Sequence, residues 1–139
     1  MNEKLCRVAL ASRENAYAPY SRFAVGAAVE MEGGAVFGGC NVENASYPQS
    51  ICAERNAIAS AVTAGYHKLL RLYVVAHPLS APCGGCRSVI AEFSTPDTEV
   101  IIADPHGEER LFKFSELMPF SFEVEQRAAV LNHQIESKI

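Results

Sequence analysis

Three cysteines and one glutamate occupy two places where the sequence predicts helices to begin. Cys52 and Glu54 stand at the first place, and Cys83 and Cys86 stand at the second. Three thiolates suit Zn²⁺, and a tetrahedral zinc with only three protein ligands keeps its fourth position for water. These residue types and spacings therefore predict a catalytic zinc site that activates water for hydrolysis.

Glu54 and Arg55, which follow Cys52 in the sequence, have predicted roles beside the metal. Glu54 begins the same helix as a ligand, so its carboxylate is expected close enough to move protons to and from water. Three thiolates leave a zinc centre with a net negative charge, which weakens its activation of water. Arg55 is expected to offset that charge by hydrogen bonding to sulfur, and a surface salt bridge is the alternative for its guanidinium.

Other readings of the cysteines remain open at this point. Cys40 or a histidine could complete a closed structural zinc site with the three cysteines. Thioredoxin-like redox chemistry at Cys83 and Cys86 is a further alternative, but it leaves Cys52 and Glu54 unexplained. The remaining cysteine, Cys6, is expected to be a small reduced hydrophobe, as is Cys40 in a catalytic site.

Length and composition favour one globular domain over residues 1–139. The chain is 49% hydrophobic and 20% charged, within the usual range for a single domain. Five cysteines in such a chain indicate metal or redox chemistry rather than a disulfide framework. The first residues lack the apolar segment of a secretory signal, and no apolar run is long enough to span a membrane. We therefore expect a cytoplasmic protein with no membrane partner.

The charge of the chain argues against a nucleic-acid polymer as partner. The formal net charge is −4, with 12 basic residues scattered among 16 acidic ones. Polynucleotide binding requires Lys and Arg gathered against phosphates, and no basic stripe is present. A small, weakly charged substrate fits this composition better.

The hydrophobic pattern predicts an α/β fold. Predicted helices cover residues 3–16, 53–64, 84–93 and 124–135, and predicted strands cover residues 23–31, 35–40, 70–76, 98–103 and 110–114. The first two strands form a hairpin through residues 32–34. This order indicates a mixed sheet with helices on both faces, and the two helices that carry cysteines begin close together. Helix N-termini favour thiolate, so both places suit metal ligands.

Several blocks of sequence together resemble a known family. The blocks lie at residues 16–23, 25–28, 39–47, 51–55, 82–87, 92–93 and 116–119. In this order they make residues 5–122 closely similar to the small homotetrameric cytidine deaminases. Those enzymes hydrolyse cytidine and deoxycytidine to uridine and deoxyuridine with release of ammonia, and the resemblance implies a role in pyrimidine salvage. It also implies a three-layer α/β/α sandwich around a mixed five-stranded sheet.

The resemblance assigns roles to the residues at the predicted metal site. It implies that Cys52, Cys83 and Cys86 bind one zinc per chain. It also implies that Glu54 carries protons from water to N3 of the cytosine ring and to the departing amino group. The metal set and the acid–base residue thus coincide with those proposed from the residue types alone.

The resemblance also implies a nucleoside-binding set around the metal. Asn41 and Glu43 share one side of a strand and would hold the ribose 3′-hydroxyl, since an amide donates and a carboxylate accepts. The backbone N–H of Ala53 would bind the base carbonyl, and Phe23 would stack on the base. The residues implied at the 5′ end of the substrate are Ala45 and Tyr47.

The active sites of this family are shared between subunits. By resemblance, Phe122 reaches the active site of a neighbouring subunit, and Phe120 is the weaker choice for that role. The predicted assembly is accordingly a homotetramer.

Some positions depart from the family pattern. Gln49, Ser50, Gly85 and Ser88 stand where other residues are usual, so substrate range is less closely defined than reaction type. A deaminase of a modified cytosine nucleoside such as blasticidin S is one alternative, although such relatives generally lack the acid found here at Glu43. A non-catalytic zinc-binding module is another, and Glu54 argues against it.

Overall fold

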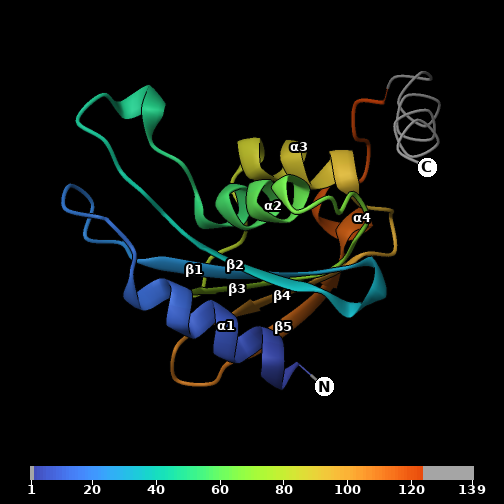
Figure 1. Ribbon diagram of the computed structural model, residues 1–139, viewed down its shortest axis with the longest axis horizontal. Coiled ribbons are helices and arrows are strands. Elements are labelled where there is room, and N and C mark those ends of the chain that lie inside the picture. The colour runs from blue at the N-terminus through green and yellow to red at the C-terminus, as the bar shows by residue number, and fades with distance from the viewer. Residues whose placement is uncertain (1, 124–139) are drawn as a thin grey trace.

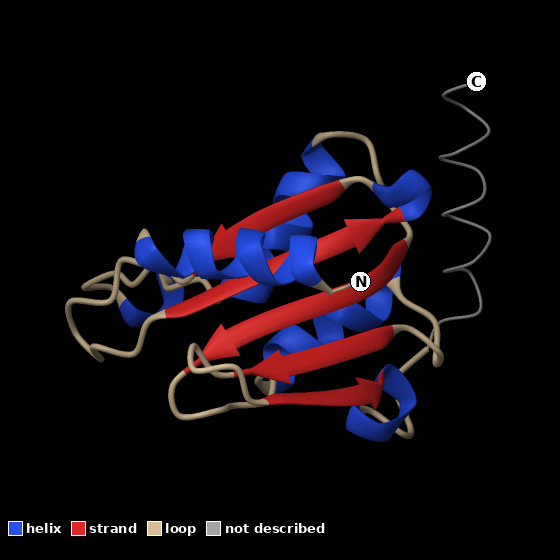
Figure 2. Ribbon diagram, turned by 90° about the horizontal axis from the view of Figure 1, so that it is seen from below, coloured by secondary structure: helices blue, strands red, loops and turns tan. Residues whose placement is uncertain are grey.

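A five-stranded mixed sheet forms the centre of the molecule, as seen in a computed structural model that describes residues 2–123. The strand order is β2-β1-β3-β4-β5 (Figure 2). β3 and β4 pair in parallel, and the other neighbours pair antiparallel. The strands are β1 Val25–Met31, β2 Val36–Cys40, β3 Leu69–Ala76, β4 Glu99–Ala103 and β5 Glu109–Lys113. The mixed five-stranded sheet is therefore confirmed.

Helices cover both faces of this sheet. The helix α1, Glu3–Glu14, lies on one face, and α2, Ala53–Thr63, and α3, Gly84–Phe93, lie on the other (Figure 1). A short helix α4, Phe114–Leu117, follows β5. The order of layers is therefore helix, sheet, helix, as the sequence predicted. No helix within residues 2–123 is long and apolar enough to cross a membrane.

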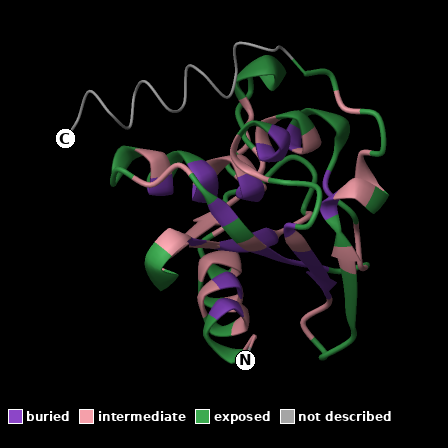
Figure 3. Cartoon of the chain, turned by 90° about the vertical axis from the view of Figure 1, so that its right-hand side faces the viewer, coloured by how far each residue is buried: buried purple, intermediate pink, exposed green. Residues whose placement is uncertain are grey.

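Alternation along the buried strands divides the core into two layers. In β3, Leu72 and Val74 pack with α2 and α3, whereas Tyr73 and Val75 pack with α1. Successive side chains of a strand point to opposite faces, so one continuous apolar run supplies both layers. Figure 3 shows the buried residues concentrated along the sheet and on the helix surfaces that face it.

Glycines let two helices approach the sheet very closely. A Cβ atom on Gly26 would lie 2.0 Å from the carbonyl oxygen of Ala9 in α1. On the opposite face, a Cβ atom on Gly39 would lie 2.4 Å from the backbone nitrogen of Ala57 in α2. Both contacts are with helix backbone, so any larger residue would force the helix away from the sheet.

The predicted element boundaries differ from the observed ones in a few places. Phe114, predicted as a strand residue, begins α4 instead, because the Glu116 carboxylate accepts a hydrogen bond from the Lys113 N–H and caps a new helix. The sequence also gave no sign of the 3₁₀ turn Tyr47–Gln49. The helix predicted at 124–135 lies outside the described residues.

Candidate metal centre and active-site pocket

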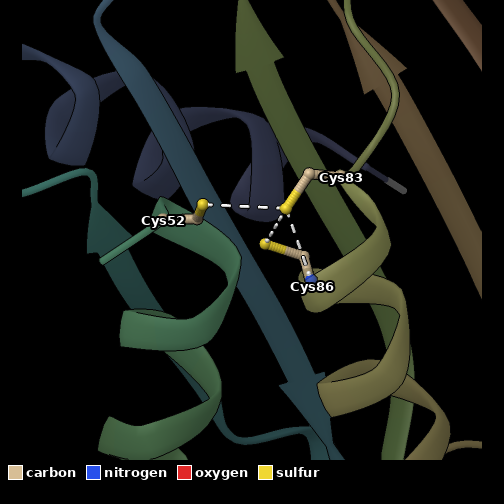
Figure 4. Close-up of side chains that lie close together, drawn as sticks. All are labelled: Cys52, Cys83 and Cys86. Carbon is tan, nitrogen blue, oxygen red and sulfur yellow. Dashed lines mark hydrogen bonds between the residues drawn. The ribbon is translucent and has the colours of Figure 1, made fainter. Parts of the chain in front are cut away.

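The three predicted zinc ligands meet at the N-termini of α2 and α3. Cys52 is the N-cap residue of α2, and Cys83 is the N-cap residue of α3. Cys86 lies in the first turn of α3, where its backbone N–H donates to Cys83 Sγ at 3.4 Å. Figure 4 shows the three sulfurs directed toward one another from the two helices.

The sulfur positions fit a tetrahedral zinc. Cys52 Sγ lies 3.9 Å from Cys83 Sγ, and Cys83 Sγ lies 3.2 Å from Cys86 Sγ. All three sulfurs lie within 4.8 Å of one another. Zn–S bonds of about 2.3 Å in a tetrahedron would place sulfurs roughly 3.8 Å apart, which the Cys52–Cys83 separation matches, whereas Cys83 and Cys86 lie closer together. The donor set is therefore both chemically and spatially suited to one Zn²⁺.

Glu54 is buried directly beside the sulfur cluster. Its side chain belongs to the first turn of α2, and the residue is only 6% exposed. The Cys86 thiol donates to Glu54 Oε2 at 3.3 Å. Burial raises the pKa of the Glu54 carboxyl above its ordinary value. A carboxyl group in this position can take up and return a proton next to the metal site.

Arg55 faces the same sulfurs from the side of α2. Its Nη2 donates to Cys52 Sγ at 3.7 Å and to the Ser50 carbonyl oxygen at 3.4 Å. The structure gives Arg55 no ion pair among residues 2–123. The pKa of Cys52 is lowered to about 5, because its interaction with the Cys86 thiol, together with the Arg55 guanidinium and Cys83, outweighs the opposing effect of burial. The guanidinium thus lies where it can balance negative charge on the sulfur cluster.

A cavity of about 160 Å³ opens beside the cysteines. Its lining includes the ligand candidates Cys52 and Cys83, and comes from the start of α2, the start of β1, β3 and the segments that flank them. Of the residues predicted to bind nucleoside, it contains Phe23, Asn41 and Ala53. The sequence reasoning did not assign a pocket role to the apolar wall, which alternation in β1 and β3 could have indicated: Val25, Val74 and Ala76.

Asn41 and Glu43 both order the loop that carries Phe23, by different contacts. The Asn41 amide donates from Nδ2 to the Phe23 carbonyl at 2.7 Å and accepts at Oδ1 from the Val25 N–H at 2.9 Å. The Glu43 carboxylate accepts from the N–H of Tyr20 at 2.9 Å, and also from the N–H and hydroxyl of Ser21. The hydroxyl bond lowers the pKa of Glu43. Asn41 lines the cavity, whereas Glu43 stands outside its lining.

Three further predicted residues lie away from the cavity of this chain. Ala45, Tyr47 and Phe122 are absent from its lining. Tyr47 is 75% exposed, with its ring edge-on to Tyr20 at a centroid separation of 6.4 Å, and Phe122 is 87% exposed. The described part of the single chain therefore does not bring these side chains to the metal site.

Comparisons with known proteins agree with this site. A family model described as the zinc-binding region of cytidine and deoxycytidylate deaminases matches residues 1–103. The chain is 43% identical to the cytidine deaminase of Halalkalibacterium halodurans over 126 residues, which covers 88% of this chain and 95% of the relative.

Solved structures give the same result. The crystal structure of cytidine deaminase from Burkholderia pseudomallei has a TM-score of 0.83 and 45% identity, covering 88% of this chain and 99% of that one. The cytidine deaminase from Mycobacterium tuberculosis has a TM-score of 0.76 and 37% identity, covering 88% of this chain and 97% of that one. With the three-cysteine donor set, these matches confirm the predicted zinc cofactor. The chain is thus a zinc-binding enzyme that belongs to the cytidine and deoxycytidylate deaminase family.

Proposed function

We propose that this enzyme hydrolyses cytidine and deoxycytidine to uridine and deoxyuridine, with release of ammonia, as a step of pyrimidine salvage in the cytoplasm. The observation that carries the proposal is the position of the buried Glu54 carboxyl. It touches Cys86 of the three-thiol metal site and lines the same cavity as Phe23 and Asn41. The carboxyl that would carry protons, the metal site that would activate water and a space of the size of a base therefore lie together at one cavity.

The chemistry divides between the metal and the chain. Zn²⁺ held by Cys52, Cys83 and Cys86 would supply Lewis-acid activation of water. Glu54 takes one proton from the attacking water and gives it to N3 of the ring, then takes the second proton from the new hydroxyl on C4 and gives it to the leaving amino group. The water oxygen forms a bond to C4, the bond from C4 to the amino nitrogen breaks, and ammonia leaves.

The cavity fits the base better than the whole nucleoside. Its volume of about 160 Å³ is below the roughly 300–1,000 Å³ of ordinary ligand pockets, so one pyrimidine ring occupies most of it. Phe23 provides an aromatic face for the ring, and the N–H of Ala53 at the start of α2 provides a donor for the base carbonyl. The sugar would then lie toward the open side, near Asn41.

Ribose binding is the proposed second role of Asn41 and Glu43. Asn41 uses one amide hydrogen and one lone pair within the chain, so a second hydrogen and a second lone pair remain for a hydroxyl. Glu43 accepts three hydrogen bonds from residues 20 and 21 and still has acceptor capacity. Both side chains would thus fix the loop and meet the sugar.

A homotetramer with shared active sites completes the proposal. Tyr20, Tyr47 and Phe122 are large side chains that are half or more exposed in the single chain. A neighbouring subunit would cover such a surface, and Phe122, Ala45 and Tyr47 would then contribute to substrate binding across the contact. Light scattering of the zinc protein tests this part independently, and a stable active monomer would contradict it.

Substrate choice is tested by comparing kcat/KM for cytidine, deoxycytidine, free cytosine, CMP and blasticidin S. Free cytosine lacks the sugar and so makes no contact with Asn41 or Glu43, and it should therefore react more slowly than either nucleoside. Cytidine and deoxycytidine should lead the series. Equal activity on free cytosine would refute the sugar contacts, and a preference for CMP or blasticidin S would replace the proposed substrate.

A further inference from the structure

Arg87 links two segments of the chain that meet beside the active-site pocket. From the second turn of α3, its Nε donates to the Pro82 carbonyl at 2.8 Å, and its Nη1 donates to the Leu117 carbonyl at 2.6 Å. The side chain is half-buried. None of the roles assigned above uses this residue.

The first acceptor belongs to the segment that delivers a metal ligand. Pro82 is buried and directly precedes Cys83. Ser80 and Ala81, the two residues before it, line the cavity next to Glu54. Fixing the Pro82 carbonyl therefore fixes the Pro82–Cys83 peptide plane, and with it the direction of Cys83 next to the cavity wall.

The second acceptor ends a short helix. Leu117 is the last residue of α4, and the last carbonyls of a helix lack partners within it. The chain continues from there through Met118 to the exposed rings of Phe120 and Phe122. The position of α4 thus determines where this aromatic segment leaves the molecule.

Arginine is chemically suited to this bridge. Its guanidinium is planar and permanently charged, and it offers donors in several directions at once. Hydrogen bonds to a charged donor are stronger than neutral ones, and partial burial shields them from water. A lysine has one compact ammonium group and cannot reproduce the fork that reaches both carbonyls.

We propose that Arg87 is a positioning residue that ties the Ser80–Cys83 segment to the C-terminal end of α4, so that the metal site and the Phe122 segment are held in one arrangement. The inference rests on the proposed function only in saying that this arrangement serves deamination. The proposed tie itself predicts how tightly zinc is held and how ordered the two segments are, and both can be measured without any substrate.

The test uses the zinc-loaded full chain with the variants Arg87→Met and Arg87→Lys. Arg110→Met is the matched control, because the exposed Arg110 side chain on β5 bonds only to the exposed Glu108 among the described residues. Loss of groups that orient a metal ligand typically costs 10–100-fold in metal affinity or activity. Zinc transfer to EDTA should therefore be about tenfold faster in Arg87→Met, intermediate in Arg87→Lys and within twofold of the parent in the control.

Hydrogen exchange of backbone amides distinguishes positioning from general destabilisation. In Arg87→Met, exchange should rise in peptides covering residues 79–86 and 114–122 and stay unchanged in β1. Cytidine turnover should fall in kcat more than it rises in KM. Unchanged zinc release in Arg87→Met, or exchange raised equally in β1, would overturn the proposal. If the proposed substrate fails to react, zinc release and hydrogen exchange still decide the role of Arg87.

Discussion

The two faces of the sheet are built alike but carry different chemistry. On the α1 face, the buried Tyr73 donates its hydroxyl proton to Glu109, and the partly buried Arg71 pairs with Glu30 and donates to Asn2, beside a cluster of apolar residues. On the α2 and α3 face, Glu54 is buried against a cysteine thiol beside an open cavity. Among residues 2–123, the sulfur cluster is the single group of three ligands suited to a metal.

The difference follows from where the helices begin. Cys52 and Cys83 cap α2 and α3 where both helices start against the same end of the sheet, so free N–H groups and ligands gather there. The helix α1 instead lies flat along its face through the close contact at Gly26. Both faces therefore contribute buried core, but within residues 2–123 the metal-ligand cluster lies on the α2 and α3 face alone, so substitutions on the α1 face should change stability without changing turnover.

The largest expected effect is the loss of activity in Glu54→Gln. The amide cannot accept the proton of water, and general acid–base steps contribute about 10²–10⁴-fold each. Because Glu54 serves more than one step, kcat for cytidine should fall by about 10⁴-fold or more. Zinc content and thermal midpoint should remain near those of the parent. A variant within tenfold of the parent would end the proposed mechanism.

The opposite face should show the reverse pattern in Gly26→Ala. The added Cβ would meet the carbonyl of Ala9 at 2.0 Å and the backbone nitrogen of Arg13 at 2.7 Å. Overpacking against backbone should lower the free energy of unfolding by about 3 kcal/mol. Urea titration measures this loss, and kcat per zinc-loaded molecule should stay within twofold. A stable variant with impaired turnover would contradict the separation of the two faces.

Asn41→Ala lies between these extremes, because it removes loop contacts and a proposed sugar contact together. Loss of two hydrogen bonds, at about 0.5–1.5 kcal/mol each, should lower stability by about 1–3 kcal/mol. The KM for cytidine should rise more than kcat falls. Measuring free cytosine as well provides the control, since its turnover should change less. Equal losses on both substrates would assign Asn41 to the loop alone.

The smallest expected effect is a gain in stability from Gly85→Ala. A Cβ atom at Gly85 meets nothing within 4 Å, and the residue lies in the first turn of α3. Alanine is favoured over glycine in helices by about 1 kcal/mol at interior positions, so a gain of about 0.5 kcal/mol is expected here. Gly84→Ala is the neighbouring comparison. Destabilisation with normal zinc content would show that this turn needs glycine.

Sequence reasoning performed best where local spacing determines geometry. Cys83 and Cys86 share a helical turn whatever surrounds them, and the start of α2 at Cys52 followed from the residues after it. The sequence did not show that Glu43 bonds to Ser21, because that contact depends on how a loop folds back. The contact of the exposed Tyr47 ring with Tyr20 likewise could not be predicted from the residues next to Tyr47 in the sequence. Contacts made through loops were the part that the sequence pattern could not predict.

The most direct test of the central claim is removal and return of zinc with cytidine turnover as the readout. The protein should contain one zinc per chain, lose deamination when a chelator removes the metal and regain it when one equivalent of Zn²⁺ is restored. Absorbance of cytidine follows the reaction, and elemental analysis follows the metal. Full activity in protein shown to be free of metal would contradict the account.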